Sequence, residues 1–321
     1  MPQPRIVVVG LGITGAAALM ALARRGTDAV GIERFEIGHD RGSSHGSTRI
    51  IRLAHFENPA YVPLMRRAYE LWHELERLSG TTLLRITGML EIGPPDGAIL
   101  RGTMASVQNY ELRPEVLDAA ALMRRYPAFR LPGGFVGLRQ ADGGYIEARA
   151  ALDANITIAA RSGARIVANE MVVGIEPRAN GVIVTTAREK IVADGLVVCA
   201  GPWLRTLLPE LPLPLRVTRQ VVGWFEPKDP AQFAADRFPV LLIDSVHGIH
   251  YGVPAYAEMG VKVAKHGHLE EIVEPDSYDR KINPRDEAAI RAFLAEFLAK
   301  AARLAEVSAP WPDALANVDD G

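Results

Sequence analysis

The alternation of apolar and polar positions predicts a strand–helix–strand unit at the start of the chain. Apolar residues form short runs at 5–9 and 29–33, and between these runs they recur three or four positions apart over 13–25. Short runs are typical of buried strands, whereas the wider spacing is typical of a helix. Gly26 follows Arg24-Arg25, which is the expected end of a helix. This order predicts a βαβ unit.

A second helical pattern follows Asn58-Pro59 and runs from about Tyr61 to Leu78. Its apolar side chains recur at the spacing of one helix face, so we expect them to pack into the core rather than to contact a cofactor. The side chains of this stripe are Tyr61, Leu64, Met65, Ala68, Leu71, Trp72, Leu75 and Leu78.

Further along, the pattern predicts more elements than one βαβ unit contains. Asn180-Gly181 is the strongest hairpin signal, and glycine pairs mark turns around 131–145. Because 321 residues exceed one typical domain, we expect an α/β protein of two domains. Predicted helices cover 114–126, 147–162 and 285–304, and predicted strands cover 84–92, 166–175, 182–186, 196–198, 217–225, 249–253 and 261–264.

Composition and charge narrow the class of partner. Apolar residues make up 48% of the chain, and the formal net charge of −2 gives no electrostatic basis for binding nucleic acid or an anionic membrane. The longest apolar run is far shorter than the roughly 18 residues of a membrane span, and the first strand leaves no room for a signal peptide. Cys199 is the single cysteine, so an internal disulfide or a cysteine-rich metal site is excluded. We therefore expect a cytoplasmic protein.

Candidate chemistry begins where the first strand ends, at the motif Gly10-Leu11-Gly12-Ile13-Thr14-Gly15. The first glycine permits a tight turn, the second lets the backbone approach a pyrophosphate, and the third lets the helix pack close to the strand. The helix N-terminus offers free N–H groups to phosphate. Glu33, at the end of the second strand, is placed to accept hydrogen bonds from a ribose diol. The sequence therefore predicts a dinucleotide site.

The chain beyond the first βαβ unit indicates which dinucleotide this site would bind. The unit continues into a polar loop and an amphipathic helix, whereas nicotinamide dehydrogenases normally continue with further βαβ units. The run 193–201 ends a buried strand in small residues and, with the hairpin at 170–186, is similar to the second dinucleotide half-motif of two-domain flavoproteins. This pattern favours FAD over NAD, and an NAD-dependent dehydrogenase stays open as the alternative.

The loop Ser44-His45-Gly46-Ser47-Thr48-Arg49-Ile50-Ile51-Arg52 leads into Tyr61-Val62-Pro63-Leu64, and the segments 219–226, 248–254 and 260–266 come later in the same order. With the glycine motif, these segments closely resemble the monomeric sarcosine oxidase and N-methyltryptophan oxidase family from residue 5 to about residue 298. The resemblance implies FAD, a secondary (N-methyl) amino acid as substrate, and O2 as electron acceptor. The products would be an aldehyde, the demethylated amino acid and hydrogen peroxide.

The same resemblance implies the fold. We expect a discontinuous, Rossmann-like FAD-binding domain at 1–85 and 140–213, and a mixed-sheet substrate domain at 86–139 and 214–297. The tail 298–321 matches nothing in the family and is interpreted as a truncated or frame-shifted end. The family's flavin-linking cysteine is absent, so we expect non-covalent FAD and a monomer. A fragment that is inactive or binds only the ADP moiety stays open as a further alternative.

Roles in catalysis also come from the resemblance. Arg52 would bind the substrate carboxylate through its planar donor fork. Arg49 would lie near the flavin ring, although without the family the two arginines would be interpreted as a solvated pair. Lys262 would stabilise the negative charge that forms when oxygen takes an electron. By contrast, we expect Lys265 to be exposed.

The remaining candidates are weaker. Tyr251 and His266 would line the substrate side, although a lone histidine is often a satisfied core residue. His45 would contact the flavin or orient Arg49, with a plain loop histidine as the alternative. Cys199 is expected to be an inert core residue. The predicted cofactor contacts are Gly10, Gly12, Ile13, Thr14, Gly15, Glu33, Arg34, Ser44, Thr48, Val172, Ala200, Gly201 and Trp203.

Overall fold

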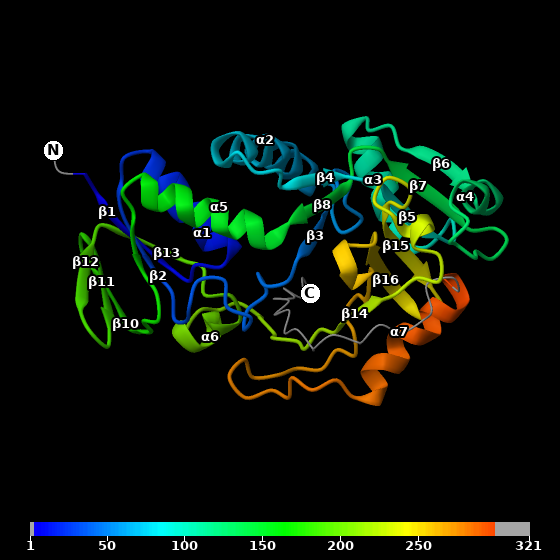
Figure 1. Cartoon of the computed structure of the whole chain (residues 1–321). Coiled ribbons are helices and arrows are strands. Elements are labelled where there is room, and N and C mark those ends of the chain that lie inside the picture. The colour runs from blue at the N-terminus through cyan, green and yellow to red at the C-terminus, as the bar shows by residue number, and fades with distance from the viewer. Residues whose placement is uncertain (1–2, 299–321) are drawn as a thin grey trace.

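The computed structural model describes residues 3–298, whose helices and strands form two groups joined by a middle layer (Figure 1). The helices are α1 (Ile13–Arg24), α2 (Tyr61–Ser79), α3 (Ala98–Tyr110), α4 (Ala119–Arg125), α5 (Ala148–Arg161), α6 (Leu204–Leu207) and α7 (Pro284–Phe297). The strands of the first half are β1 (Arg5–Val9), β2 (Asp28–Ile32), β3 (Thr48–Ile51), β4 (Leu84–Ile86), β5 (Met89–Gly93), β6 (Glu115–Asp118), β7 (Val136–Gln140) and β8 (Gly144–Glu147). The later strands are β9 (Arg165–Val167), β10 (Val172–Arg178), β11 (Gly181–Thr186), β12 (Lys190–Ala193), β13 (Gly195–Val198), β14 (Val222–Phe225), β15 (Val240–Ser245), β16 (Gly248–Val253) and β17 (Val261–Lys265).

The first group is built on a parallel sheet of order β13-β1-β2-β9. Val7 and Val9 of β1 pack against the antiparallel sheet β10-β11-β12 on one face, whereas Val8 packs with residues of α1 and α5 on the other. A strand covered on both faces needs apolar side chains at every position, which explains the uninterrupted apolar run. The predicted βαβ unit is confirmed, and the α/β fold class with it.

The middle layer is the small sheet β3-β8-β4 with α2 and α5 beside it (Figure 1). The prediction that the whole apolar stripe of α2 packs into the core is wrong in part. Leu75 is buried, but Leu64 is 65% exposed, and Tyr61 and Leu71 are exposed as well. The helix contacts the core along a narrower face than its periodicity suggests.

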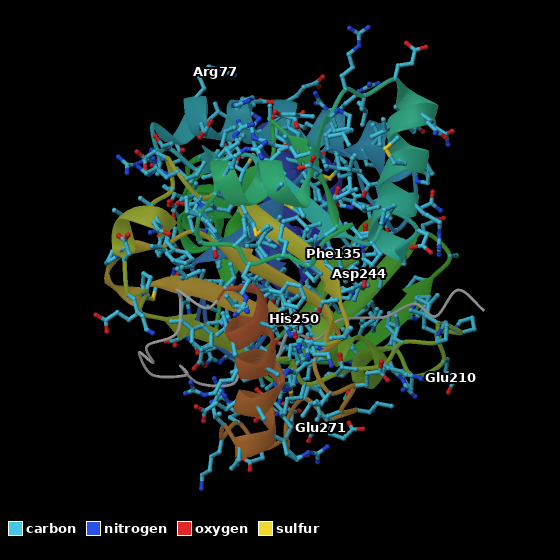
Figure 2. All side chains as sticks on the ribbon, turned by 90° about the vertical axis from the view of Figure 1, so that its right-hand side faces the viewer. Arg77, Phe135, Glu210, Asp244, His250 and Glu271 are labelled. Carbon is cyan, nitrogen blue, oxygen red and sulfur yellow. The ribbon has the colours of Figure 1, made fainter. Side chains whose placement is uncertain are left out.

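The second group is built on a seven-stranded sheet of order β14-β17-β16-β15-β5-β7-β6, mixed in direction because β5 pairs in parallel with β15. One face is covered by apolar side chains of α4 and α7. His250 of β16 lies against α7, with its ring stacked on Phe293 at 4.2 Å between centroids (Figure 2). The opposite face, around Met89 and Leu242, packs toward α3 and the middle layer.

Several predicted boundaries are corrected by local geometry. The predicted strand 84–92 is two strands in different sheets, because Gly88 turns the chain at a φ of +80°. The predicted helix 114–126 begins as β6, and Asp118 then caps α4 by accepting the Ala121 N–H at 2.7 Å. The predicted strand 166–175 divides into β9 and β10, and the 298–304 end of the predicted last helix lies outside the helix or outside the described residues. The sequence predictions did not include α3, β7, β12 and β15.

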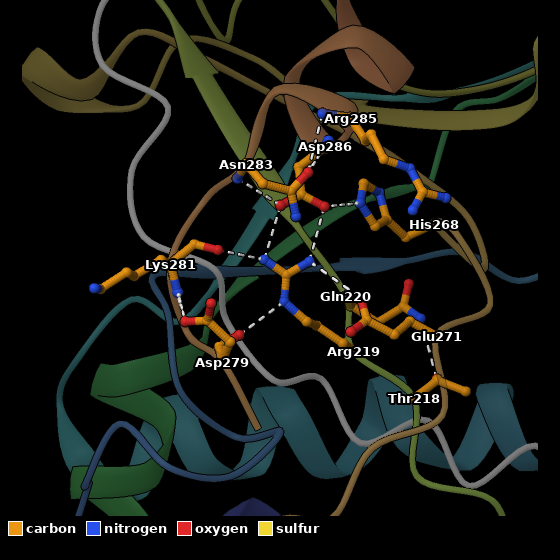
Figure 3. Close-up of polar contacts among 10 residues, drawn as sticks. All are labelled: Thr218, Arg219, Gln220, His268, Glu271, Asp279, Lys281, Asn283, Arg285 and Asp286. Atoms are coloured by element: carbon orange, nitrogen blue, oxygen red, sulfur yellow. Dashed lines mark hydrogen bonds and ion pairs between the residues drawn. The ribbon is translucent and has the colours of Figure 1, made fainter. Parts of the chain in front are cut away.

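The segment between β17 and α7 is fixed at its base by a buried charged cluster (Figure 3). The guanidinium of Arg219 donates to both carboxylate oxygens of Asp286 at 2.8 Å, and the His268 ring lies 2.9 Å from the same carboxylate. Arg219 also donates to the backbone carbonyls of Asp279 and Lys281. Because the side chains of Arg219, His268 and Asp286 are almost completely buried, the cluster gives the segment a defined course.

Candidate functional site

The glycine motif forms a turn in which no side chain fits at two positions. Gly10 has a φ of +87°, and a Cβ there would lie 2.3 Å from the Cys199 carbonyl oxygen. A Cβ on Gly15 would lie 1.8 Å from the carbonyl oxygen of Gly10. The backbone of β1, α1 and β13 therefore meets at van der Waals distance, as the motif predicts.

The N-terminus of α1 points its free amides at the loop that comes after β2. Gly12, the N-cap residue, supplies no side-chain hydrogen bond, and a Cβ there would lie 2.7 Å from Ser44 Oγ. The Ser44 hydroxyl instead accepts the Ile13 N–H at 2.9 Å. The Ile13 amide is therefore satisfied within the protein, and a phosphate bound here would use the other amides of the turn or take the place of Ser44.

Glu33 is buried beside this turn. Its carboxylate accepts the Leu11 N–H at 2.8 Å and the Phe35 N–H at 3.0 Å, and His39 Nε2 lies 3.4 Å away. Burial alone would raise the pKa of this carboxyl, but the hydrogen bonds from His39 and the two amides outweigh burial and lower the pKa. Glu33 is therefore ionised at neutral pH and able to accept further hydrogen bonds.

These residues surround a cavity of about 880 Å³, large enough for a dinucleotide. Most predicted cofactor contacts line it, but Gly15 lies behind the turn and Thr48 lies beyond the lining. Cys199, expected in the core, is half-buried and also lines the cavity, and burial raises the pKa of its thiol. The predicted residues in the lining are Gly10, Gly12, Ile13, Thr14, Glu33, Arg34, Ser44, His45, Val172, Ala200, Gly201 and Trp203.

The rim of this cavity is met by the segment that precedes α7, which reaches toward α6 in Figure 1. Asp276 accepts a hydrogen bond from Arg34 Nη1 at 3.0 Å and another from Trp203 Nε1 at 2.9 Å. Arg280 pairs with Asp40 at 2.9 Å. The second group of elements thus contacts the nucleotide side through charged residues that no motif marked.

Arg49 and Lys262 converge on one backbone carbonyl. Arg49 donates to the carbonyl oxygens of Thr48 at 2.8 Å and His45 at 2.6 Å, and also to that of Ser43. The Lys262 ammonium donates to the same Thr48 carbonyl at 3.2 Å. Two cations from β3 and β17, far apart in the sequence, are thereby brought together at the end of the loop 42–48.

Lys262 itself is buried, with its Nζ 5.8 Å from the centroid of the Trp224 ring. Lys265 was expected to be exposed, but it is half-buried in the structure. Of the two lysines, Lys262 is the one that contacts the loop lining the cavity. A buried ammonium in this position is suited to stabilising developing negative charge.

His45 lies between the cavity and these cations. Burial and the neighbouring Arg49 lower the pKa of the imidazole to about 3, so the ring is neutral at physiological pH. A neutral ring next to Arg49 can donate or accept one hydrogen bond without adding positive charge.

Arg52 is buried, and it is already paired with carboxylates that sequence reasoning missed. Its Nη2 donates to both oxygens of Glu57, at 2.7 and 2.8 Å, and its Nε lies 3.4 Å from Glu91. The pKa of Glu57 is lowered to about 2, because hydrogen bonds and charges from His55 and Arg52 outweigh its partial burial. A glutamate inside the apolar strand 89–93 was the signal that could have marked Glu91.

Phe56 is a common neighbour of Arg52 and of the predicted substrate-side residues His266 and Tyr251. The Phe56 ring lies 5.5 Å from the Arg52 guanidinium carbon and 6.4 Å from the centroid of His266, which is exposed. Tyr251 is half-buried and packs with Phe56 on the same apolar cluster. The structure therefore gathers the predicted catalytic side chains into two neighbouring groups around 48–56.

Metal ions and membrane spans find no support in the described part of the chain. Within residues 3–298 no group of three or more histidine, cysteine or acidic side chains is placed to hold a metal ion. Among the helices of the same range, none combines the length and apolarity that crossing a membrane requires.

Comparison with known proteins agrees with this geometry. The family model described as FAD dependent oxidoreductase matches residues 5–320. The monomeric sarcosine oxidase of Streptomyces avermitilis is 34% identical over 295 residues, covering 90% of this chain and 76% of that protein. The N-methyl-L-tryptophan oxidase of Salmonella dublin is 34% identical over 272 residues, covering 84% and 72%. The resemblance inferred from loop 44–52 is confirmed, but the expectation that the tail of the chain matches nothing in the family is wrong, because the family model extends to residue 320.

Solved structures give the same result. NikD, titled an unusual amino acid oxidase essential for nikkomycin biosynthesis, matches with a TM-score of 0.81 and 26% identity over 94% of this chain and 79% of its own. Glycine oxidase from Geobacillus kaustophilus shares the fold, with a TM-score of 0.74 and 18% identity over 96% of this chain and 82% of its own.

Proposed function

As the chain belongs to the family of FAD-dependent oxidoreductases, we propose that it oxidises a secondary, N-methyl amino acid such as sarcosine or N-methyltryptophan with O2. One water hydrolyses the resulting imine, so the products are an aldehyde, the demethylated amino acid and hydrogen peroxide. The observation that carries the proposal is the placement of two buried cations, Arg52 and Lys262, beside the segment 42–52. The first part of this segment lines the dinucleotide cavity, and Lys262 donates to its Thr48 carbonyl.

FAD is the cofactor, and we propose that it is held without a covalent bond. The single cysteine of the chain, Cys199, lies against the glycine turn, where the pyrophosphate would sit. Gly10, Gly12 and Gly15 form the cradle, the amides at the start of α1 face the phosphates, and Glu33 accepts the ribose hydroxyls. This end of the site is completed by Arg34, Ser44, Val172, Ala200, Gly201 and Trp203. Thr48 supports the end of the site near Lys262.

Arg52 binds the substrate carboxylate. A guanidinium presents a planar fork that matches a carboxylate, and burial strengthens the pairing. Glu57 occupies this fork in the structure and is itself 40% exposed on its side chain. Binding of the substrate therefore requires its carboxylate to replace or share the contacts of Glu57. His266 and Tyr251 line the same side of the site.

Lys262 and Arg49 act on oxygen. Bound FAD would supply the two-electron chemistry that couples oxidation of the amine to reduction of O2. The Lys262 ammonium stabilises the negative charge that oxygen acquires. Arg49 fixes the carbonyls of Ser43, His45 and Thr48, so the loop that carries Lys262's acceptor keeps its shape. His45 stays neutral and orients Arg49.

The division of the chain into domains also enters the proposal. A discontinuous FAD-binding domain at 1–85 and 140–213, and a substrate domain at 86–139 and 214–297, are supported by the separation of the parallel sheet β13-β1-β2-β9 from the seven-stranded sheet. We further propose a cytoplasmic monomer acting on small molecules.

Reconstitution and peroxide release test the activity. The purified protein is incubated with FAD, freed of unbound flavin, and assayed for hydrogen peroxide with sarcosine and with N-methyltryptophan. We expect a flavin absorption spectrum and peroxide from at least one of the two. Bound flavin without peroxide over a wide panel of N-methyl amino acids would contradict the proposed substrate class.

A further inference from the structure

Glu91 is an acidic residue in an otherwise apolar strand. It comes after Met89 and Leu90 in β5 and is completely buried. Alternation along the strand places it on the same face as Met89, which packs toward α3 and the middle layer. A buried carboxyl in such surroundings is costly unless its oxygens find partners.

Gln140 of β7 supplies one partner and links Glu91 to the chain beside Arg52. The Gln140 amide donates to Glu91 Oε2 at 3.0 Å and to the Ala54 carbonyl at 3.2 Å. Its own oxygen accepts the Ala54 N–H at 2.7 Å. Gln140 thus ties Glu91 to the backbone of Ala54, two residues beyond Arg52. This link limits how far the side chains of Glu91 and Arg52 can separate.

The other oxygen of Glu91 faces Arg52. Glu91 Oε1 lies 3.4 Å from Arg52 Nε. Over the described residues, both atoms are buried and neither has a hydrogen-bond partner. A donor and an acceptor left unpaired and facing each other are each other's natural partners after a small shift of the guanidinium.

We propose that Glu91 is a positioning residue for Arg52, holding the Nε edge of the guanidinium from the sheet side so that its Nη edge faces the substrate carboxylate. The inference rests on the proposed function of Arg52 as the carboxylate-binding residue. The two edges are occupied differently, because Glu57 on the Nη edge is 40% exposed on its side chain whereas Glu91 is 0% exposed. Only the outer partner can give way to a substrate.

The charge of Glu91 is consistent with this role. Burial raises the pKa of Glu91 to about 7, while Arg52 and the neighbouring side chains of Thr103 and Gln140 oppose the rise and Glu57 adds to it. Arg52 is therefore the cation that most favours the ionised form of this buried carboxyl, and the attraction acts equally on the guanidinium.

Matched amide-for-acid variants test the proposal in the FAD-loaded protein. Glu91→Gln and Glu57→Gln remove the same charge from opposite edges of Arg52. Each variant is assayed with the faster of sarcosine and N-methyltryptophan and with its carboxamide, which lacks the carboxylate. A carboxamide that is not oxidised is measured as a competitive inhibitor.

We expect Glu91→Gln to raise KM for the amino acid about tenfold, with kcat within about twofold and with little change for the carboxamide. Glu57→Gln should lower KM for the amino acid, because a competing carboxylate is gone. Glu91→Asp keeps the charge and should recover part of the loss, and it serves as the test variant where Glu91→Gln does not fold. A crystal structure of either Glu91 variant should show the guanidinium displaced from its position.

Other results would overturn the proposal in distinguishable ways. A lower KM in Glu91→Gln would show that Glu91 competes with the substrate, and equal effects on amino acid and carboxamide would show a purely structural residue. Arg52→Gln distinguishes failure of the Glu91 proposal from failure of the proposed function of Arg52. If it leaves the preference for amino acid over carboxamide unchanged, the proposed function of Arg52 fails, whatever Glu91 does.

Discussion

The dinucleotide turn and the arginine–lysine region are built by opposite means. The turn depends on the absence of side chains, since a Cβ on Gly15 would lie 1.8 Å from a carbonyl oxygen. The arginine–lysine region depends on charges that are present and already satisfied, with Arg52 on Glu57 and Lys262 on the Thr48 carbonyl. On the proposed function, the first region would recognise its ligand with backbone, whereas the second would exchange internal partners for a substrate.

This difference teaches what each region tolerates. A backbone cradle has no alternative arrangement, so an added methyl group disturbs both folding and binding. A charged side chain can be replaced by a neutral one of similar size without filling or emptying space. Substitutions in the second region should therefore change individual steps of the reaction while the protein stays folded.

The strongest test of the charged region is Lys262→Met. Removing the ammonium should slow the reoxidation of reduced flavin by oxygen about 100- to 1,000-fold, because charge stabilisation in a buried site is lost. Reduction of the flavin by the amine should change far less. Stopped-flow measurement of the two half-reactions separates them, with Lys265→Met as the matched control. Equal losses in both half-reactions would contradict the role in oxygen activation.

The corresponding test of the backbone cradle is Gly15→Ala. The new methyl group would have to push α1 away from β1, so we expect a loss of about 1–3 kcal/mol in unfolding free energy. FAD affinity should fall about 100-fold, the equivalent of two factors of ten in Kd. Urea unfolding and flavin-fluorescence titration measure the two effects. Gly133→Ala is the control, since a Cβ there meets nothing within 4 Å. Unchanged FAD affinity in Gly15→Ala would show that the close packing is dispensable.

The two regions also differ in how far the sequence predicted them. The cradle is local, because Gly10, Gly12, Gly15 and Glu33 belong to one βαβ unit whose periodicity and glycine spacing are visible in about 30 consecutive residues. Its predicted strand, helix and strand were confirmed to within a residue or two. Loop 44–52 was identified by resemblance, and its position beside the cavity results from the same unit.

The arginine–lysine region was predicted only in part. Arg52 was identified, but its partners Glu57 and Glu91 carry no motif. Gln140, which donates a hydrogen bond to Glu91, is brought beside it by the pairing of β5 with β7. The same limit explains the missed strand β7, which is fixed by pairing with β5, whereas β15 is an apolar run whose strand pattern was overlooked. For α2, periodicity indicated a helix correctly but not which of its apolar residues the core would cover.

The smallest effect is expected at Glu33, which combines the two kinds of interaction because its charged side chain accepts hydrogen bonds from the backbone of the cradle. The hydrogen bonds from His39, Leu11 and Phe35 hold its folded-state pKa below the ordinary 4.5 in spite of burial. A carboxyl whose pKa is lowered by folding stabilises the folded state above its unfolded pKa, and the contribution is lost as pH falls through the folded pKa. The stability that Glu33 provides is therefore present at neutral pH and lost in acid below 4.5.

Glu33→Gln keeps the size of the side chain but offers a single acceptor oxygen to the two amides. We expect about 1–2 kcal/mol less stability at neutral pH, a shallower loss of stability in acid, and FAD affinity about tenfold weaker. Urea unfolding at a series of pH values without FAD, combined with FAD titration at neutral pH, measures each effect separately. The exposed Glu36→Gln is the control and should match the parent throughout. A parallel acid limb in Glu33→Gln and the parent would show that this carboxylate is not the group linking the cradle to pH.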